Sequence, residues 1–197
     1  MNMNFSQYTE FAKVKEIWND IFHDKKGLNE FLKNVVMNDT MTDENNHNGH
    51  SIMLPDLSDI YVLVSKEDFP FDQLEPTQKK SIDLSMAKKN FVLGYIWLCP
   101  WKVENEECVP IHFICFIDSR ISGLNIARYM IDEYEGECEE RYLLPYEIDM
   151  GAKKYWKRYL MEVYDVKNKK NLQQMMKEIG VESHDVKWEN LYEMFSA

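Results

Sequence analysis

Two runs of large apolar residues, 91–98 and 109–117, constrain the fold of this chain most. The first run is interrupted only by Gly94, and a glycine within a strand often marks a bulge or the close approach of another group to the backbone. Pro100 is expected to end this strand, and an acidic turn over 103–107 separates it from the second run. The pattern predicts two buried strands that form an antiparallel hairpin.

A turn that contains Gly123 and then a helix follow the second strand directly. The apolar positions of the helix are Ile126, Ala127, Met130, Ile131 and Tyr134. Backbone N–H groups of the turn and of the first helical turn would point outward, with the positive end of the helix dipole behind them. Gly123 would let a phosphate approach the main chain, and Arg120 would add charge at the rim. The segment therefore predicts a pyrophosphate site, and the absence of GxGxxG and GxxxxGK motifs disfavours NAD and ATP.

Hydrophobic periodicity predicts the other elements. Helices are expected over 5–23, over 28–36, after Thr77 and over 152–163, strands over 60–64 and 142–148, and short amphipathic pieces over 172–179 and 188–195. A polar loop is expected over 38–50, and the connection 65–90 is long enough to be functional or disordered. The 197 residues are expected to form one domain, with a core over about 5–165 and a helical C-terminal extension over about 167–197.

Charge and cysteine content exclude several classes of function. The chain has 34 acidic and 23 basic residues and a formal net charge of −11, which opposes sequence-independent nucleic-acid binding and favours cationic partners. Its four cysteines form no CxxC pair, and no stretch reaches 18 apolar residues. A cytoplasmic protein with reduced thiols and no membrane span is therefore expected. His47 and His50 have no third ligand close by in the sequence, so no metal site is expected.

The chain resembles the GNAT superfamily of acyl-CoA-dependent N-acyltransferases. The resemblance rests on the strand 111–117, on the turn Arg-Ile-Ser-Gly-Leu-Asn at 120–125, on the strand 142–148 and on the helix 152–159. The turn matches the family's Gln/Arg-x-x-Gly-x-Gly/Ala loop except at Asn125. The order of elements also fits. The resemblance implies an α+β fold: a mixed, mostly antiparallel sheet with helices on both faces and a V-shaped splay between two central strands.

The resemblance also implies an activity. The chain would be an N-acetyltransferase that moves an acetyl group from acetyl-CoA, a co-substrate, to a primary amine of a small molecule or peptide. CoA would lie between the strands 109–117 and 142–148. The residues implied to bind it are Phe116, Ile117, Asp118, Arg120, Ile121, Ser122, Gly123, Leu124 and Asn125.

An acid and a base complete this expectation, because the attacking amine must be neutral and the departing thiolate needs a proton. In many family members the acid is a Tyr four residues after an Ala on the last helix, but counting from Ala152 gives Trp156. Tyr155 is therefore the first candidate for the acid and Tyr159 the second. The candidates for the base are Glu147, Asp149 and His112.

Other interpretations are open at this point. His112 and the aromatic residues of the helix 152–159 would equally suit core packing. The chain could be a non-catalytic binding or regulatory protein on the same scaffold, in which the missing helix Tyr reflects lost chemistry. It could also be an interaction protein in which 120–125 is a plain turn. The segment 188–195 would suit a homodimer contact as well as a core.

Overall fold

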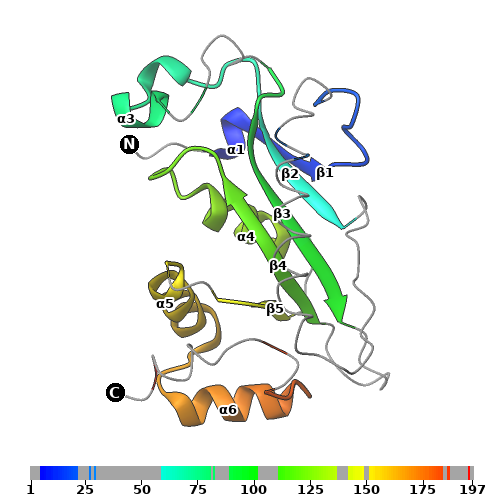
Figure 1. Cartoon of the computed structure of the whole chain (residues 1–197), viewed down its shortest axis with the longest axis vertical. Helices are drawn as coiled ribbons and strands as arrows, with labels where there is room; N and C mark the ends of the chain where they lie inside the picture. Colours follow the sequence, from blue (N-terminus) through cyan, green and yellow to red (C-terminus); the bar gives the residue numbers. More distant parts are fainter. Residues whose placement is uncertain are drawn as a thin grey trace. The chain divides into compact units, whose positions relative to one another are not determined.

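A computed structural model describes residues 5–21, 27, 29, 59–80, 82, 89–101, 111–136, 142–148, 151–183, 186 and 195. Five strands form one sheet in the order β1-β2-β3-β4-β5 (Figure 1). The strands are Thr9–Lys13 (β1), Ile60–Ser65 (β2), Val92–Trp101 (β3), Ile111–Ser119 (β4) and Tyr142–Pro145 (β5). The α-helices are Phe5–Tyr8 (α1), Pro76–Lys79 (α3), Ile126–Gly136 (α4), Lys153–Tyr164 (α5) and Lys169–Glu178 (α6), and Phe71–Gln73 is a 3₁₀ helix (η2). The α+β class is confirmed.

The sheet is mostly antiparallel. β2 pairs antiparallel with β1 and with β3, and the arrows of the neighbouring strands β3 and β4 run in opposite directions in Figure 1. β5 pairs in parallel with β4, from Ile111 opposite Tyr142 to Ile114 opposite Pro145. This pairing covers only the first part of β4, which continues to Ser119. Pro100 does not end β3, because the strand continues to Trp101.

The helix predicted over 5–23 is wrong beyond its first turn. The helix α1 ends at Tyr8, and the Thr9 hydroxyl donates to the Phe5 carbonyl across 2.6 Å. Thr9–Lys13 instead pairs residue by residue with β2, and the Phe11 ring stacks on Tyr61 at 5.3 Å. Pairing with a distant buried strand outweighs the local helical periodicity here.

Several predicted segments lie outside the described residues. They are the helix over 28–36 apart from Asn29, the loop over 38–50, the acidic turn over 103–107 and the piece over 188–195 apart from Phe195. In the part of the chain that is described, no helix is long and apolar enough to cross a membrane.

The chain divides into two compact units. The first comprises Met1–Leu98 and Phe116–Cys138, and the second comprises Cys99–Cys115 and Glu139–Ala197. The boundaries pass through β3 and β4, which belong to one sheet. The single domain predicted from chain length stays a prediction.

In the first unit, α4 packs on one face of the sheet. Its buried residues are Ile126, Met130, Ile131 and Tyr134, and the Tyr134 ring meets Tyr61 of β2 edge-on at 5.1 Å. A Cβ added at Gly94 of β3 would lie 2.6 Å from the Asp118 carbonyl oxygen and 2.9 Å from Met130 Cε. The prediction that Gly94 marks a close approach to the backbone is confirmed.

In the second unit, α5 packs on β5 through tyrosine hydroxyls. Tyr159 Oη and Tyr164 Oη both donate to the Leu143 carbonyl, at 3.2 and 3.1 Å. Tyr164 Oη also accepts from the Leu143 N–H at 2.9 Å. The helix α6 follows with Asn168 as its N-cap, and its buried residues are Leu172, Met175 and Met176. The predicted amphipathic piece over 172–179 is therefore helical through Glu178.

Candidate functional site

Residues 120–125 join β4 to α4 and are called here the β4–α4 loop. Hydrogen bonds and buried side chains within the first unit hold this loop in place. The Arg120 N–H donates to the Leu93 carbonyl of β3 at 2.9 Å. The Ser119 hydroxyl donates to the Ile121 carbonyl at 3.3 Å. Ile121 and Leu124 are buried, with 0% and 6% of their surface exposed. Buried anchors at both ends therefore fix the path of the loop.

The remaining loop residues, Ser122, Gly123 and Asn125, are exposed. Gly123 has φ +78° and Asn125 has φ +57°, both in the left-handed region. The Asn125 carbonyl accepts from the Tyr129 N–H at 3.0 Å and so begins the helical hydrogen bonds of α4. Exposed backbone at the start of an eleven-residue helix provides N–H donors together with the positive end of the helix dipole. An anion can be bound at this kind of terminus.

The left-handed backbone at Asn125 gives a reason for the mismatch with the Gly/Ala of the loop motif that the sequence resembles. After glycine, Asn is among the residues that enter this region most readily. Asn125 thus meets a backbone requirement that alanine would meet only with strain. The sequence alone showed the replacement but not its reason, because φ cannot be read from residue type.

Positive charge at the loop comes from Arg120. Its guanidinium carbon lies 5.7 Å from the centre of the Tyr95 ring of β3, a distance at which a cation is attracted to an aromatic face. Asp118, near the end of β4, is exposed, whereas Arg120 is half-buried. The nine residues predicted to bind CoA lie along one segment, since Phe116, Ile117 and Asp118 are in the last part of β4 and the other six form the loop.

Gln78 of α3 is a loop contact that sequence reasoning missed. Its Nε2 donates to the Ser122 carbonyl at 3.2 Å, and its Oε1 accepts from the Glu75 N–H at 2.9 Å. The second bond belongs to a capping pattern, Glu75 followed three residues later by Gln. That pattern could have been found in the sequence, but the contact with a residue 44 positions away could not.

The predicted acid and base candidates lie in the second unit. Tyr159 is 1% exposed, and its hydroxyl donates to Leu143, which gives this side chain a structural role in packing. Tyr155 is half-buried, with its ring 5.1 Å from Trp156. Glu147 is exposed. The catalytic roles of all three stay predictions.

Two further base candidates differ in what the structure shows. His112 lies on β4 opposite Leu143 and is half-buried. Asp149 is outside the described residues. In the ranges that the structure describes, no group of three His, Cys, Asp or Glu side chains could hold a metal ion.

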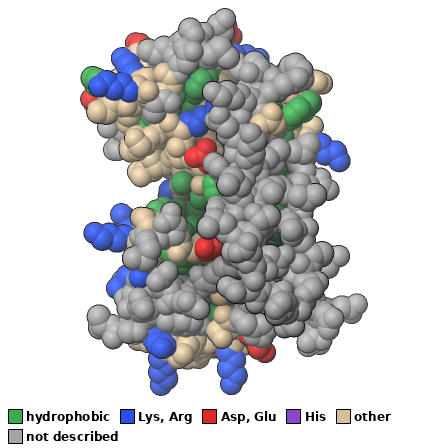
Figure 2. Space-filling view, viewed as in Figure 1, with side chains coloured by type: hydrophobic (Ala, Val, Ile, Leu, Met, Phe, Trp, Pro, Cys, Tyr) green, Lys and Arg blue, Asp and Glu red, His purple; other side chains and the backbone are tan. Residues whose placement is uncertain are grey.

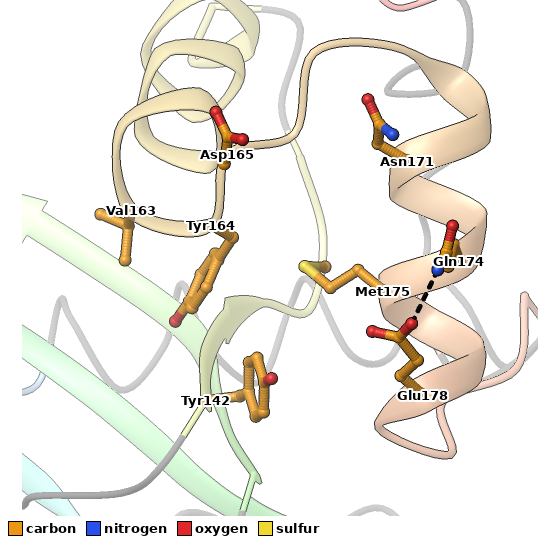
Figure 3. Close-up of a pocket in the computed structure, with 8 residues that line it drawn as sticks. All are labelled: Tyr142, Val163, Tyr164, Asp165, Asn171, Gln174, Met175 and Glu178. Atoms are coloured by element: carbon orange, nitrogen blue, oxygen red, sulfur yellow. Dashed lines mark hydrogen bonds between the residues drawn. The ribbon is translucent and has the colours of Figure 1, made fainter.

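The second unit contains a pocket of about 400 Å³, shown in Figure 3. Its lining residues are Tyr142, Val163, Tyr164, Asp165, Asn171, Gln174, Met175 and Glu178. Asp165 is the C-cap of α5 and pairs with Lys167 at 3.0 Å. Glu178 accepts from Gln174 at 2.9 Å, the dashed line in Figure 3. Two carboxylates and the negative end of α5 disfavour a polyanion such as CoA here.

Positive side chains are common on the surface despite the net charge of −11. Figure 2 shows Lys and Arg side chains at several places on the face it draws. Exposed basic residues described in the second unit are Lys154, Arg158, Lys167, Lys169, Lys170 and Lys177. Basic side chains are thus present on the surface of the second unit despite the acidic excess of the chain.

No protein-family model matches the chain, and no curated protein matches its sequence. Among solved structures, the chain is similar to one described as "Putative acetyl transferase from Pyrococcus furiosus". The two are 13% identical, and the similarity covers 77% of this chain and 91% of that chain with a TM-score of 0.36. The function proposed below is supported by the geometry of the β4–α4 loop.

Proposed function

We propose that the chain is a GNAT-like N-acetyltransferase that moves an acetyl group from acetyl-CoA to a primary amine of a small molecule or peptide. The observation that carries the proposal is the β4–α4 loop. The side chains of Ile121 and Leu124 are buried and anchor the loop. Gly123 and Asn125 are exposed and have left-handed backbone just before α4. This arrangement suits the diphosphate of CoA, because backbone N–H groups and the helix dipole stabilise the same negative charge.

The order of elements supports the same proposal. From β2 onward, the sequence β2, β3, β4, α4, β5 and α5 is the order that the family resemblance implies. β5 is parallel to β4, as the implied mixed sheet requires. The N-terminal helices of the family pattern are not part of this support, since α1 ends at Tyr8.

The proposed reaction joins the amine nitrogen to the thioester carbonyl carbon and breaks the carbon–sulfur bond. The amine loses one proton to a base, and the CoA thiolate gains one from an acid, so protons and electron pairs balance. We assign the acid to Tyr155 rather than Tyr159, because the Tyr159 hydroxyl already donates to the Leu143 carbonyl. The base is assigned to Glu147, whose exposure lets it act directly or through a water molecule.

Calorimetry with CoA and acetyl-CoA, followed by a single-turnover assay, tests the proposal. The assay would offer polyamines, amino sugars, amino acids and basic peptides as acceptors and follow the release of free thiol. We expect CoA binding and thioester cleavage that depends on one class of amine. Absence of both CoA binding and cleavage with every acceptor would overturn the proposal.

A CoA-binding protein without transferase activity is the second candidate function. It is favoured by Trp156, which stands at the position of the family's tyrosine and is only 4% exposed. It predicts CoA binding in calorimetry together with no turnover for any acceptor. Single-turnover chemistry with even one amine would exclude it.

A further inference from the structure

The side-chain amide of Gln78 bridges two segments that are 44 residues apart in the sequence. Its Oε1 accepts from the Glu75 N–H at 2.9 Å, and its Nε2 donates to the Ser122 carbonyl at 3.2 Å. Both bonds lie within the range of ordinary hydrogen bonds. One planar group thus connects the first turn of α3 with the β4–α4 loop.

The segment that carries Gln78 is itself supported. Leu74, just before α3, is 3% exposed and anchors the segment to the core. Pro76 begins the helix, where its fixed φ suits the first helical position. Lys79 Nζ donates to the Asp72 carbonyl at 2.6 Å. Because Oε1 is engaged by Glu75, the amide of Gln78 has one orientation, and Nε2 is the atom directed at Ser122.

The contact with Ser122 determines where the next backbone N–H points. The Ser122 carbonyl and the Gly123 N–H belong to one peptide group, which is planar and trans, so they point in opposite directions. A donor that fixes the carbonyl therefore also fixes the N–H. Gln78 also lies beside Gly123, since a Cβ added there would be 3.5 Å from Nε2.

We propose that Gln78 is a positioning residue for diphosphate recognition: by holding the Ser122 carbonyl, it directs the Gly123 N–H toward the ligand. The inference rests on the proposed function for the identity of the ligand, the diphosphate of CoA. Gln78 acts through the backbone of the loop, and its loss removes the alignment of one donor rather than the whole site. One hydrogen bond of this kind corresponds to about a three- to tenfold change in affinity.

The test uses the full chain and the near-isosteric variant Gln78→Met, which removes both hydrogen bonds without adding charge. The matched control is Gln73→Met, at an exposed residue of η2. Calorimetry would compare CoA with S-acetylpantetheine, which lacks the diphosphate. We expect Gln78→Met to lower the affinity for CoA about three- to tenfold and to leave the affinity for S-acetylpantetheine unchanged. Hydrogen exchange at the Gly123 amide should also become faster in the ligand-free variant.

The outcomes separate this inference from the proposed function. If wild-type protein binds inorganic pyrophosphate but not CoA, the proposed function fails, and a selective loss of pyrophosphate binding in Gln78→Met still supports the positioning role. If wild-type protein binds CoA and Gln78→Met binds it equally well, the positioning role alone is overturned. Equal losses for CoA and S-acetylpantetheine, or equal losses in Gln73→Met, would also overturn it. Wild-type protein that binds neither CoA nor pyrophosphate would overturn both.

Discussion

The Arg120 N–H donates to the Leu93 carbonyl across 2.9 Å and so joins the start of the β4–α4 loop to β3. Leu93 is also the residue that the register of β2 with β3 skips, since Leu63 is opposite Gly94 and Val64 is opposite Val92. An extra residue of this kind is a bulge, which bends a strand locally. The bulge and the adjacent glycine together let the loop lie close against β3.

The first prediction concerns Gly94, where an added Cβ would meet the Asp118 carbonyl oxygen at 2.6 Å. We expect Gly94→Ala to lower the free energy of unfolding by about 1–3 kcal/mol, because backbone must move to make room. Denaturant unfolding measures this. The control is Gly136→Ala, a helical position with nothing within 4 Å of the added Cβ, which should leave stability unchanged or raise it by up to about 1 kcal/mol. A free energy of unfolding that is the same in Gly94→Ala as in wild type would contradict the close approach of the Asp118 carbonyl to Gly94.

A second prediction separates backbone strain from ligand binding. Gly123 and Gly180 have similar φ values, +78° and +74°, and space for a Cβ at both. Alanine at either position should lower the free energy of unfolding by about 1–2 kcal/mol through left-handed strain. Only Gly123→Ala is expected also to weaken CoA binding, because only Gly123 belongs to the β4–α4 loop. Calorimetry on both variants checks this, and equal CoA affinity in the two would count against the loop as the diphosphate site.

The elements that the sequence predicted well are those whose pattern is local. The apolar runs in Val92–Trp101 and Ile111–Ser119 and the periodic apolar faces of α4, α5 and α6 are visible in any short window. The long N-terminal helix failed because Thr9–Lys13 is determined by pairing with β2, about fifty residues later in the chain.

The candidate site shows the same division between local and distant causes. Gly123 and Arg120 were predicted from a short motif beside a strand and a helix, all within one segment. Gln78 was not predicted, because its contact is with Ser122, 44 positions away, and no local sequence pattern at position 78 indicates this contact. The exposed or buried state of Tyr155 and Tyr159 was equally unreadable, since it depends on how α5 packs against β5.

A third prediction concerns Tyr159, which we expect to have a structural role, unlike Tyr155. Tyr159→Phe should lower the free energy of unfolding by about 0.5–1 kcal/mol, because a buried hydrogen bond is lost. The loss is small because the Leu143 carbonyl keeps its bond from Tyr164. Thermal or denaturant unfolding would show it.

Tyr155→Phe tests the proposed acid and is the fourth prediction. Loss of a positioned general acid slows a reaction by about 10²–10⁴-fold. We expect single-turnover acetyl transfer to fall by that order while CoA affinity stays unchanged. Transfer at the wild-type rate in this variant would show that the thiolate takes its proton from another group.

The fifth prediction concerns Tyr129 of α4, whose pKa is raised from 10.0 to about 12. Burial is the largest cause, and hydrogen bonding to Glu133 adds to it. Since the unfolded chain loses this proton at a lower pH than the folded chain, the stability that it contributes is complete below pH 10.0 and lost as pH rises toward about 12.

The measurement is the free energy of unfolding of wild type and Tyr129→Phe across that pH interval. Wild type should lose more stability than the variant as pH rises, because phenylalanine has no proton to release. Glu133→Gln is the matched change at the partner: it removes the negative charge beside the phenol, so the pKa of Tyr129 should fall toward 10.0. Identical pH profiles for wild type and Tyr129→Phe would show that the phenol titrates alike in the folded and unfolded chains.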